Sequence, residues 1–281
     1  MLRRSVTRAR GRDKIDNHVM KSSLPNSNLV AAITLIGTAV GIATVLFAAD
    51  QKQARITEVI HDVRLLAAQT NARPAAVNDT VREGTAVRTG TDSRAELTFV
   101  DQTLTRLGAN TVFSFGATAR TYDLGSGAIL MSAPKEAGTV KITTAVATCA
   151  VSGFTAIVER HSSSWNKFII LHGDGWLRIN GIPDDPCQLH TGQMVVFPPH
   201  PTHCPPVLNI DISKLLNGKL AKGFKGPLPE LNIILTDIEN PPPNSGLIDP
   251  TNQDAIDQAM NAHMEMRPEP RPTVIPSDAH F

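Results

Sequence analysis

Two histidines and a cysteine lie close together in the last third of the chain, at His200, His203 and Cys204. Imidazole nitrogens and a thiolate at this spacing could share a zinc or copper ion, because these metals prefer nitrogen and sulfur ligands. A metal site needs three or four protein ligands, and the other histidines of the chain stand apart from this cluster. The three residues are therefore candidate metal ligands, although the surrounding proline-rich run is more simply an exposed turn.

The same segment resembles one motif of a known metal-binding fold. Gly192, five further residues, Pro198 and then His200 are similar to the second motif of cupin barrels, in which the histidine helps to bind a metal. The first cupin motif, H-x-H followed by a glutamate, has no counterpart in this sequence. A cupin-like metal-binding enzyme or sensor that uses His200 and His203 is therefore carried as the alternative function.

No other part of the sequence carries a motif for chemistry. The chain contains no G-x-S-x-G, no H-E-x-x-H and no phosphate-binding loop. Its charge is nearly balanced, with 27 Lys and Arg against 26 Asp and Glu, and only 4% of its residues are aromatic. A nucleic-acid interface needs a cationic surface or aromatic platforms for base stacking. We therefore expect a protein that is not an enzyme, holds no cofactor and binds no nucleic acid.

Three cysteines leave two alternatives open. Cys187 and Cys204 lie in proline-rich turns, and in an oxidising compartment they could bridge the two sides of a hairpin. Alternatively, these two and Cys149 are all free or buried thiols. The sequence has no C-x-x-C motif, which argues against a zinc knuckle and a thioredoxin-like redox site.

An uncharged apolar stretch at residues 29–49 predicts export of the rest of the chain. At a rise of about 1.5 Å per residue, a helix of this length crosses the hydrocarbon layer of about 30 Å. Basic residues exceed acidic ones ahead of it, which favours a cytoplasmic N-terminus. The stretch is either an uncleaved anchor or a signal peptide cut near Ala49. Met20 is a second candidate start, which would leave a short signal-peptide n-region.

Between about residues 80 and 200 the pattern is that of an all-β domain. Short β-branched runs alternate between apolar and polar residues, as in the segment in which Ala95, Leu97 and Phe99 share one face. Turn residues separate these runs about every ten positions. Gly173-Asp174-Gly175 predicts a hairpin turn, because glycine tolerates positive φ.

After residue 182 the composition changes, since 17 of the 20 prolines lie there. Proline gives up a backbone donor and fixes φ, so residues 198–210 and 225–250 are expected to be extended linkers. Residues 212–224 and 251–266 are candidate helices, the second with a capping box at Thr251 and Asp254. Its apolar stripe is expected to pack on its own domain rather than on a partner helix. Residues 267–281 resemble a frayed tail.

The run that begins at Val81 carries a glycine, then V-R-T-G, a Ser-Arg pair, a strand that ends in Asp and a leucine-rich strand followed by an Asn turn. In these features it resembles the opening of a FecR-type domain, a regulator family of the bacterial envelope. The family's closing G-Q pair matches Gly192 and the residue after it. The motif residues, to which we assign structural roles, are Gly84, Arg88, Thr89, Gly90, Arg94 and Gly192.

Arg88 and Arg94 are expected to project towards carboxylates such as Glu83 or Glu96. The family has Asp-Gly where this chain has Asp101-Gln102, so that turn must be built differently. Too few residues precede the apolar stretch for the family's cytoplasmic anti-sigma domain, so the resemblance covers the exported domain alone.

The resemblance implies an all-β fold, either a sandwich or solenoid-like, with an N-terminal transmembrane or signal helix and a proline-rich C-terminal extension. We expect a non-catalytic interaction, signalling or scaffold module in the inner membrane or periplasm. The family implies an envelope partner, the signalling domain of an outer-membrane transporter. The expected organisation is a basic cytoplasmic segment, the apolar stretch, a spacer, the FecR-like domain and the extension, at residues 1–28, 29–49, 50–76, 77–200 and 201–281.

Overall fold

The computed structural model describes most of the chain after residue 52. The described ranges are residues 53–68, 71–116, 120–161, 163–182, 186–239 and 246–265. Within them no helix has both the length and the apolar character that a membrane crossing needs. The predicted transmembrane or signal segment at residues 29–49 lies outside these ranges.

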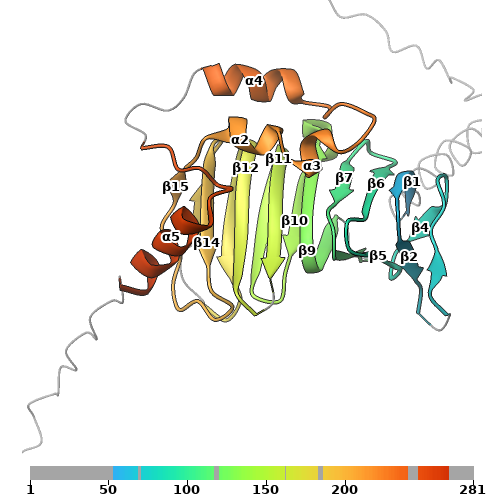
Figure 1. Cartoon of the computed structure of the whole chain (residues 1–281), viewed down its shortest axis with the longest axis horizontal. Coiled ribbons are helices and arrows are strands. Elements are labelled where there is room, and N and C mark those ends of the chain that lie inside the picture. The colour runs from blue at the N-terminus through green and yellow to red at the C-terminus, as the bar shows by residue number, and fades with distance from the viewer. Residues whose placement is uncertain are drawn as a thin grey trace, which may run out of the picture. The chain divides into compact units, whose positions relative to one another are not determined.

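The all-β prediction is confirmed, since most of the described residues that form regular structure lie in strands. The strands are β1 (Gln53–Ile60), β2 (Val63–Leu66), β3 (Arg73–Pro74), β4 (Thr80–Arg82), β5 (Ala86–Thr89), β6 (Arg94–Phe99), β7 (Leu104–Leu107), β8 (Val112–Phe115), β9 (Thr121–Ala133), β10 (Thr139–Thr143), β11 (Ala147–His161), β12 (Trp165–Ile179), β13 (Cys187–Leu189), β14 (Gln193–Phe197) and β15 (Leu208–Asn209). The helices are the 3₁₀ turn η1 (Lys135–Ala137), α2 (Ile212–Leu216), α3 (Lys219–Lys222), α4 (Leu231–Glu239) and α5 (Gln253–Glu265) (Figure 1).

Three long strands, β9, β11 and β12, each change partners halfway along their length. Residues 127–133 of β9 pair with β7 and β11, whereas its earlier residues pair with β8 and β10. The strand β12 pairs with β14 before its midpoint and with β13 after it. The pairing therefore divides one continuous sheet into two layers that share these three strands.

Glycines with positive φ stand where the long strands change partners. Gly127, Gly153 and Gly173 have φ of 85°, 56° and 90°. A Cβ on Gly127 would lie 2.3 Å from the Thr111 hydroxyl oxygen, and one on Gly173 would lie 2.5 Å from the Gly153 carbonyl oxygen. Glycine is required here by conformation and by space. The hairpin predicted at Gly173 is therefore wrong, because the glycine bends β12 without ending it.

We call the two parts the covered layer and the open layer. The covered layer includes β1, β6, β7, β14, and residues 127–133, 154–160 and 166–170 of the long strands. The open layer includes β2, β5, β8, β10, β13, and residues 121–126, 147–152 and 174–179 of the long strands.

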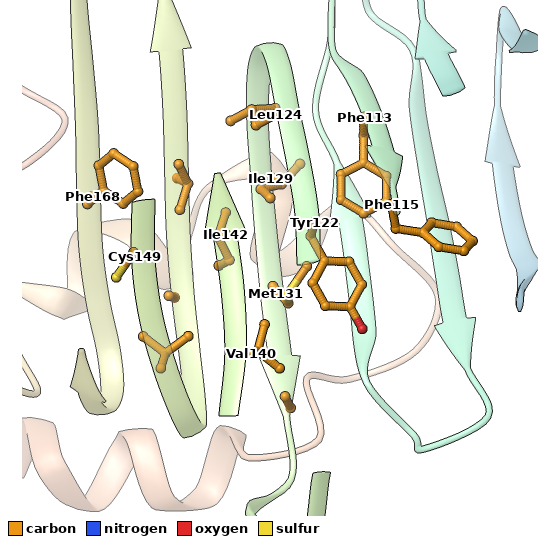
Figure 2. Packing of buried hydrophobic residues seen from close by; sticks show 14 of the residues in the cluster. Phe113, Phe115, Tyr122, Leu124, Ile129, Met131, Val140, Ile142, Cys149 and Phe168 are labelled. Atoms are coloured by element: carbon orange, nitrogen blue, oxygen red, sulfur yellow. The ribbon is translucent and has the colours of Figure 1, made fainter. Parts of the chain in front are cut away.

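Inward side chains of both layers meet in a single apolar core. Phe113 and Tyr122 stack with ring centroids 6.2 Å apart, and Phe99 meets Tyr122 edge-to-face at 5.0 Å. Figure 2 shows Phe113 and Tyr122 together with Cys149 and Phe168 further along the core. Burial raises the pKa of the Cys149 thiol to about 12 and raises that of the Tyr122 hydroxyl as well. The interior of the domain therefore holds these two groups in their neutral forms.

The C-terminal helices bury the outer face of the covered layer. Ile157, Ile169 and Met194 point outward from this layer and form a second apolar cluster with residues of α2 and α4. Val196 of β14 packs against Ile256 and partly buried Met260 of α5, so the predicted packing of the α5 stripe on its own domain is confirmed for these two residues. The C-terminal segment is thus a structural layer of the domain.

The helix predictions for this segment are partly correct. The candidate helix at 212–224 is interrupted at Asn217 and Gly218, which separate α2 from α3. Helix α4 forms inside the segment 225–250, where extended chain was expected, because its apolar residues pack on the sheet. Helix α5 forms as predicted, but the Asn252 side chain, rather than that of Thr251, accepts from the Asp254 amide at 3.0 Å.

Candidate interaction surface

A buried arginine of β7 holds the segment 220–227 against the covered layer. The Arg106 side chain is 0% exposed, and its Nε donates to Glu96 Oε2 at 2.9 Å. Its Nη1 donates to the Ala221 carbonyl at 2.7 Å, and Nη2 donates to the Gly226 carbonyl. The guanidinium carbon lies 4.7 Å from the centroid of the Phe224 ring. One side chain thus joins a sheet carboxylate to the backbone of a segment more than 110 residues later in the chain.

The neighbouring strands β1 and β6 complete this polar contact. Glu96 also accepts from the Thr57 hydroxyl at 2.8 Å, which gives its second carboxylate oxygen a partner. The Lys225 amide donates to Glu58 Oε2 at 3.0 Å. A buried ion pair with satisfied lone pairs is costly to break, because the partner left behind is an uncompensated charge. The segment 220–227 is therefore held in a defined conformation.

Helix α4 and the residue before it are tied to the same face by two further contacts. The Thr155 hydroxyl is fully buried and donates to Glu230 Oε2 at 2.9 Å. His172 Nδ1 lies 2.8 Å from Asp237 Oδ2, so the imidazole of β12 meets the carboxylate of α4. The carboxylates of Glu230 and Asp237 therefore point towards the sheet.

A third contact fixes the turn that precedes α5. Lys167 of β12 is 3% exposed, and its ammonium donates to the Pro250 carbonyl at 3.0 Å. Glu159 Oε2 lies 3.4 Å from the same ammonium, and the Trp165 ring centroid lies 4.7 Å from it. The buried lysine is thus paired and hydrogen-bonded, as its burial requires.

The anchored helices enclose an apolar groove of about 650 Å³ between α2, the segment 221–228 and α4. Its apolar lining comprises Leu216, Ala221, Phe224, Pro227, Leu228, Leu231, Leu235 and Ile238. Lys222 and Lys225 are the charged residues that line it, and within the described chain no acidic residue does. The groove can bind apolar side chains, with two cations at its rim.

The shape of the groove depends on how α2 and α3 begin and end. The Asp211 side chain caps α2 by accepting from the Ser213 amide at 3.0 Å. A Cβ on Gly223, which follows α3, would lie 2.2 Å from the Lys219 carbonyl oxygen. Glycine therefore lets the chain turn tightly after α3 and carry Phe224 back towards Arg106.

The family-motif residues hold turns of the β-domain, apart from this groove. Thr89 is 2% exposed, and its hydroxyl donates to the Gly108 carbonyl at 2.6 Å and accepts from the Thr111 amide at 2.9 Å. The Gly90 amide donates to the Asp62 carbonyl at 2.9 Å. Thr89 and Gly90 therefore join the turns around β5.

Gly84 and Gly192 have φ of 73° and 75°, in the left-handed region that glycine adopts without cost. Gln102 also has positive φ, 66°, in the turn that we expected to be built differently from a glycine turn. The Asp101 side chain supports that turn by accepting from the Thr103 amide at 3.0 Å. The turn thus uses a glycine-like backbone conformation without a glycine.

The prediction that Arg88 and Arg94 project towards Glu96 is wrong, because Glu96 pairs with Arg106 instead. Arg88 is exposed on β5 and lies directly opposite Arg64 of β2. Arg94 lies at the start of β6, opposite Ile60 of β1. The pairing of β6 with β7 places Arg106 directly opposite Glu96, and the Glu96 carboxylate therefore pairs with Arg106.

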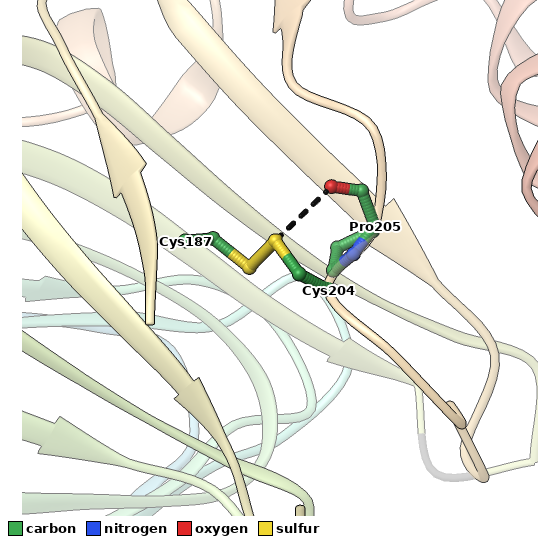
Figure 3. The surroundings of a disulfide bond; sticks show 3 residues. All are labelled: Cys187, Cys204 and Pro205. Carbon is green, nitrogen blue, oxygen red and sulfur yellow. Dashed lines mark hydrogen bonds between the residues drawn. A yellow bond between two sulfur atoms is a disulfide. The ribbon is translucent and has the colours of Figure 1, made fainter. Parts of the chain in front are cut away.

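The candidate metal ligands are not brought together. Cys204 is joined to Cys187 by a disulfide bond with Cα atoms 5.9 Å apart, so it has no thiolate to offer (Figure 3). His203 Nδ1 lies 3.0 Å from the neighbouring Thr202 hydroxyl. In the described ranges, no group of three or more His, Cys, Asp or Glu side chains is placed to hold a metal ion. The disulfide connects β13 to the loop after β14. These two strands pair with opposite halves of β12.

Sequence reasoning missed Arg106 and the groove that it supports. A local signal was present, since Arg106 is a charged residue inside the run Leu104–Leu107, opposite a glutamate in the alternating strand β6. The carbonyls that it binds have no side-chain signature. Their positions depend on the fold of the C-terminal segment.

Comparison with known proteins confirms the resemblance to FecR. Residues 85–174 match the family model described as FecR protein. Two crystal structures from Parabacteroides distasonis ATCC 8503, each described as a "putative anti-sigma factor", are similar to the chain at 15% identity. For the first, the TM-score is 0.39 and the match covers 47% of this chain and 64% of that chain. For the second, the TM-score is 0.40 and the match covers 65% of this chain and 92% of that chain. No curated protein matches the chain.

Proposed function

We propose, on the premise of the FecR-type segment at residues 85–174, that this protein is an exported, non-catalytic module of the bacterial envelope that binds another protein. The family match is the observation that carries the proposal. The partner class that the family implies is the signalling domain of an outer-membrane transporter. The described chain offers apolar and backbone surfaces for such a role, and we assign no catalytic residue.

Free strand edges are the surfaces through which we propose that the β-domain binds. In the described sheet, β4 pairs on one side with β1, and β13 pairs on one side with β12. The unpaired backbone groups of an edge strand can accept a strand from another chain. The β-domain would then recognise its partner by β-augmentation.

Two features support export of the domain. The apolar residues 29–49 have the length of a membrane-crossing helix, whether this segment is retained as an anchor or removed as a signal peptide. The disulfide between Cys187 and Cys204 is of a kind that persists in oxidising compartments such as the periplasm. A periplasmic or membrane-anchored position of residues 50–281 would account for both.

One experiment on intact cells and spheroplasts tests the location and the binding surface together. Thiols are trapped with an alkylating agent, and a photoreactive residue is placed either at Thr80 on the β4 edge or at Lys141 in β10. Both side chains are exposed, but β10 is paired on both sides by β9 and β11. Buried Cys149 is the internal control, since it should react with the alkylating agent only after denaturation.

We expect Cys187 and Cys204 to be oxidised and the domain to be digested by protease added to spheroplasts. We also expect a protein adduct at Thr80 and none at Lys141. Reduced cysteines in a protease-resistant protein would refute export. Equal adducts at the two positions, or none at either, would refute binding through strand edges.

A further inference from the structure

We propose that the groove between α2, the segment 221–228 and α4 binds an amphipathic helix of a partner protein, one that carries carboxylates beside its apolar stripe. This inference deepens the proposed function, on which it rests, by adding a second surface and the chemistry of its ligand. The groove lies on the C-terminal segment, beyond the residues that match the family model.

The lining of the groove is suited to an apolar helix face. Its volume of about 650 Å³ accommodates several aliphatic side chains, and its apolar residues come from both walls and the intervening segment. A helix that docks in a groove uses anchors at positions i, i+3 or i+4, and i+7, which fall along one line. Leu235 of α4 lines the groove and is 44% exposed, so an apolar surface here is in contact with water. Apolar surface concentrated in a groove is characteristic of an interaction site.

The charges around the groove favour acidic residues beside the apolar stripe of the partner helix. Lys222 and Lys225 are both exposed at its rim, and Lys222 donates to the Asn217 side chain at 2.5 Å. Among the described residues, no acidic side chain lines the groove. Glu230 accepts from Thr155, Asp237 contacts His172 on the sheet, and Glu58 accepts from the Lys225 amide, while Glu239 lies at the end of α4. Carboxylates that flank an incoming apolar stripe would therefore meet cations.

The groove is organised before any ligand arrives. Arg106 holds the carbonyls of Ala221 and Gly226, which lie on the wall opposite α4. Ile234 of α4 is 0% exposed, which fixes the other wall against the sheet. Binding to such a site has little ordering entropy to overcome.

The charge and the shape of the groove favour a partner protein over this chain itself. A second copy would bring the same two lysines to the interface. The chain's own last residues, 266–281, include four prolines and two arginines, a composition that disfavours an acidic amphipathic helix. A partner helix of acidic character matches both features of the groove.

The test uses the full chain and two synthetic peptides of about 15 residues, long enough to form a helix. Both have leucines at the i, i+3 or i+4, and i+7 positions, with glutamates on the remaining faces of one peptide and lysines on those of the other. Peptide binding is measured by fluorescence anisotropy at low and high salt. The test variant is Leu235→Asp, and the matched control is Ile233→Asp on the same helix. Ile233 is 47% exposed and does not line the groove.

We expect the glutamate peptide to bind and Leu235→Asp to weaken it by about tenfold or more, while Ile233→Asp changes the affinity by less than about twofold. Lys225→Glu should weaken the glutamate peptide and strengthen the lysine peptide, and salt should reduce both differences. Equal binding of the two peptides, or equal losses for the two α4 variants, would overturn the proposal.

A photoreactive residue at position 235 of the full chain tests the other occupants. An adduct with residues 266–281 of the same chain, or a cross-linked dimer, would overturn the assignment of the groove to a partner. The Thr80 adduct reports separately on the strand edges. Loss of peptide binding with a retained Thr80 adduct would refute the groove and leave the proposed function intact. Loss of the Thr80 adduct with peptide binding retained would refute binding through the strand edges and leave the groove proposal intact.

Discussion

The two halves of strand β11 differ in how their side chains are buried. From Ala147 to Ser152, every second residue is buried and the others are partly or fully exposed, as in a sheet with one face in water. From Phe154 to Val158, every residue is buried. Strand β12 shows the same contrast in reverse order, with residues 166–171 buried throughout and residues 174–179 alternating. The continuous halves belong to the covered layer and the alternating halves to the open layer.

This contrast shows that the C-terminal segment is needed to complete the fold. The inner faces of both layers share one apolar core, whereas the outer face of the covered layer is closed by helices far away in the sequence. The core is held by apolar packing, and the helices are held in addition by polar contacts from Arg106, Thr155, His172 and Lys167. We therefore expect a substitution in the core to destabilise the whole domain. A substitution in one of the polar contacts should loosen only the C-terminal segment.

Phe113→Ala should have the largest effect, because it removes a fully buried ring from the core that both layers share. We expect a loss of about 4 kcal/mol in the free energy of unfolding, measured by urea denaturation. Hydrogen exchange should become faster throughout both layers. Trp176→Ala is the control, since this ring is 48% exposed on the open layer and should cost less than about 1 kcal/mol. Equal losses in the two variants would contradict the shared core.

Arg106→Leu should cost about 3 kcal/mol and act locally, because it leaves Glu96 buried without its partner and frees the carbonyls of the segment 220–227. Hydrogen exchange should become faster in residues 212–239 before the strands are affected. Adding Glu96→Gln should recover part of the loss, since it removes the uncompensated charge.

Arg64→Leu is the control. The ion pair of Arg64 with Asp62 is exposed, so this substitution should change the free energy of unfolding by less than about 0.5 kcal/mol.

A uniform increase in exchange across the domain of the Arg106→Leu variant would contradict the local role. It would mean that the C-terminal segment and the β-domain unfold as one unit.

Thr155→Val should have the smallest effect, about 1 kcal/mol, because it removes only the hydroxyl, which hydrogen-bonds with Glu230 and with the Ser132 hydroxyl, while keeping the shape of the side chain. A double-mutant cycle with Glu230→Ala, measured by thermal or urea unfolding, isolates the contact between Thr155 and Glu230. If the double variant loses no more stability than either single variant, the two side chains act through one contact, and that contact holds α4 to the sheet. Strictly additive losses would show that the two side chains contribute independently.

The β-domain was largely predictable from local sequence. The alternation of Ala95, Leu97 and Phe99 and the turns at Gly84 and Asn110 follow from side-chain periodicity and positive φ. The helix at α4 was missed because the many prolines of its segment suggested an extended linker, and its helical form depends on packing against the sheet.

The candidate site was much less predictable than the fold. The local pattern around His200, His203 and Cys204 suggested a metal, but the pairing of Cys204 with Cys187 depends on where β13 and the loop after β14 meet. The groove requires α2, the segment 221–228 and α4 to be brought onto one face, and no spacing in the sequence records that arrangement.

The sequence by itself determined the β-rich fold and the FecR-type segment, because strand alternation and turn glycines act over a few neighbouring residues. Only the tertiary structure decided which strand halves are covered, which backbone carbonyls Arg106 binds, and that the C-terminal helices enclose a groove. These features arise from contacts between residues more than 60 positions apart, such as His172 with Asp237 and Arg106 with Ala221. Their free energy comes from burying two distant surfaces together, which a local pattern cannot encode.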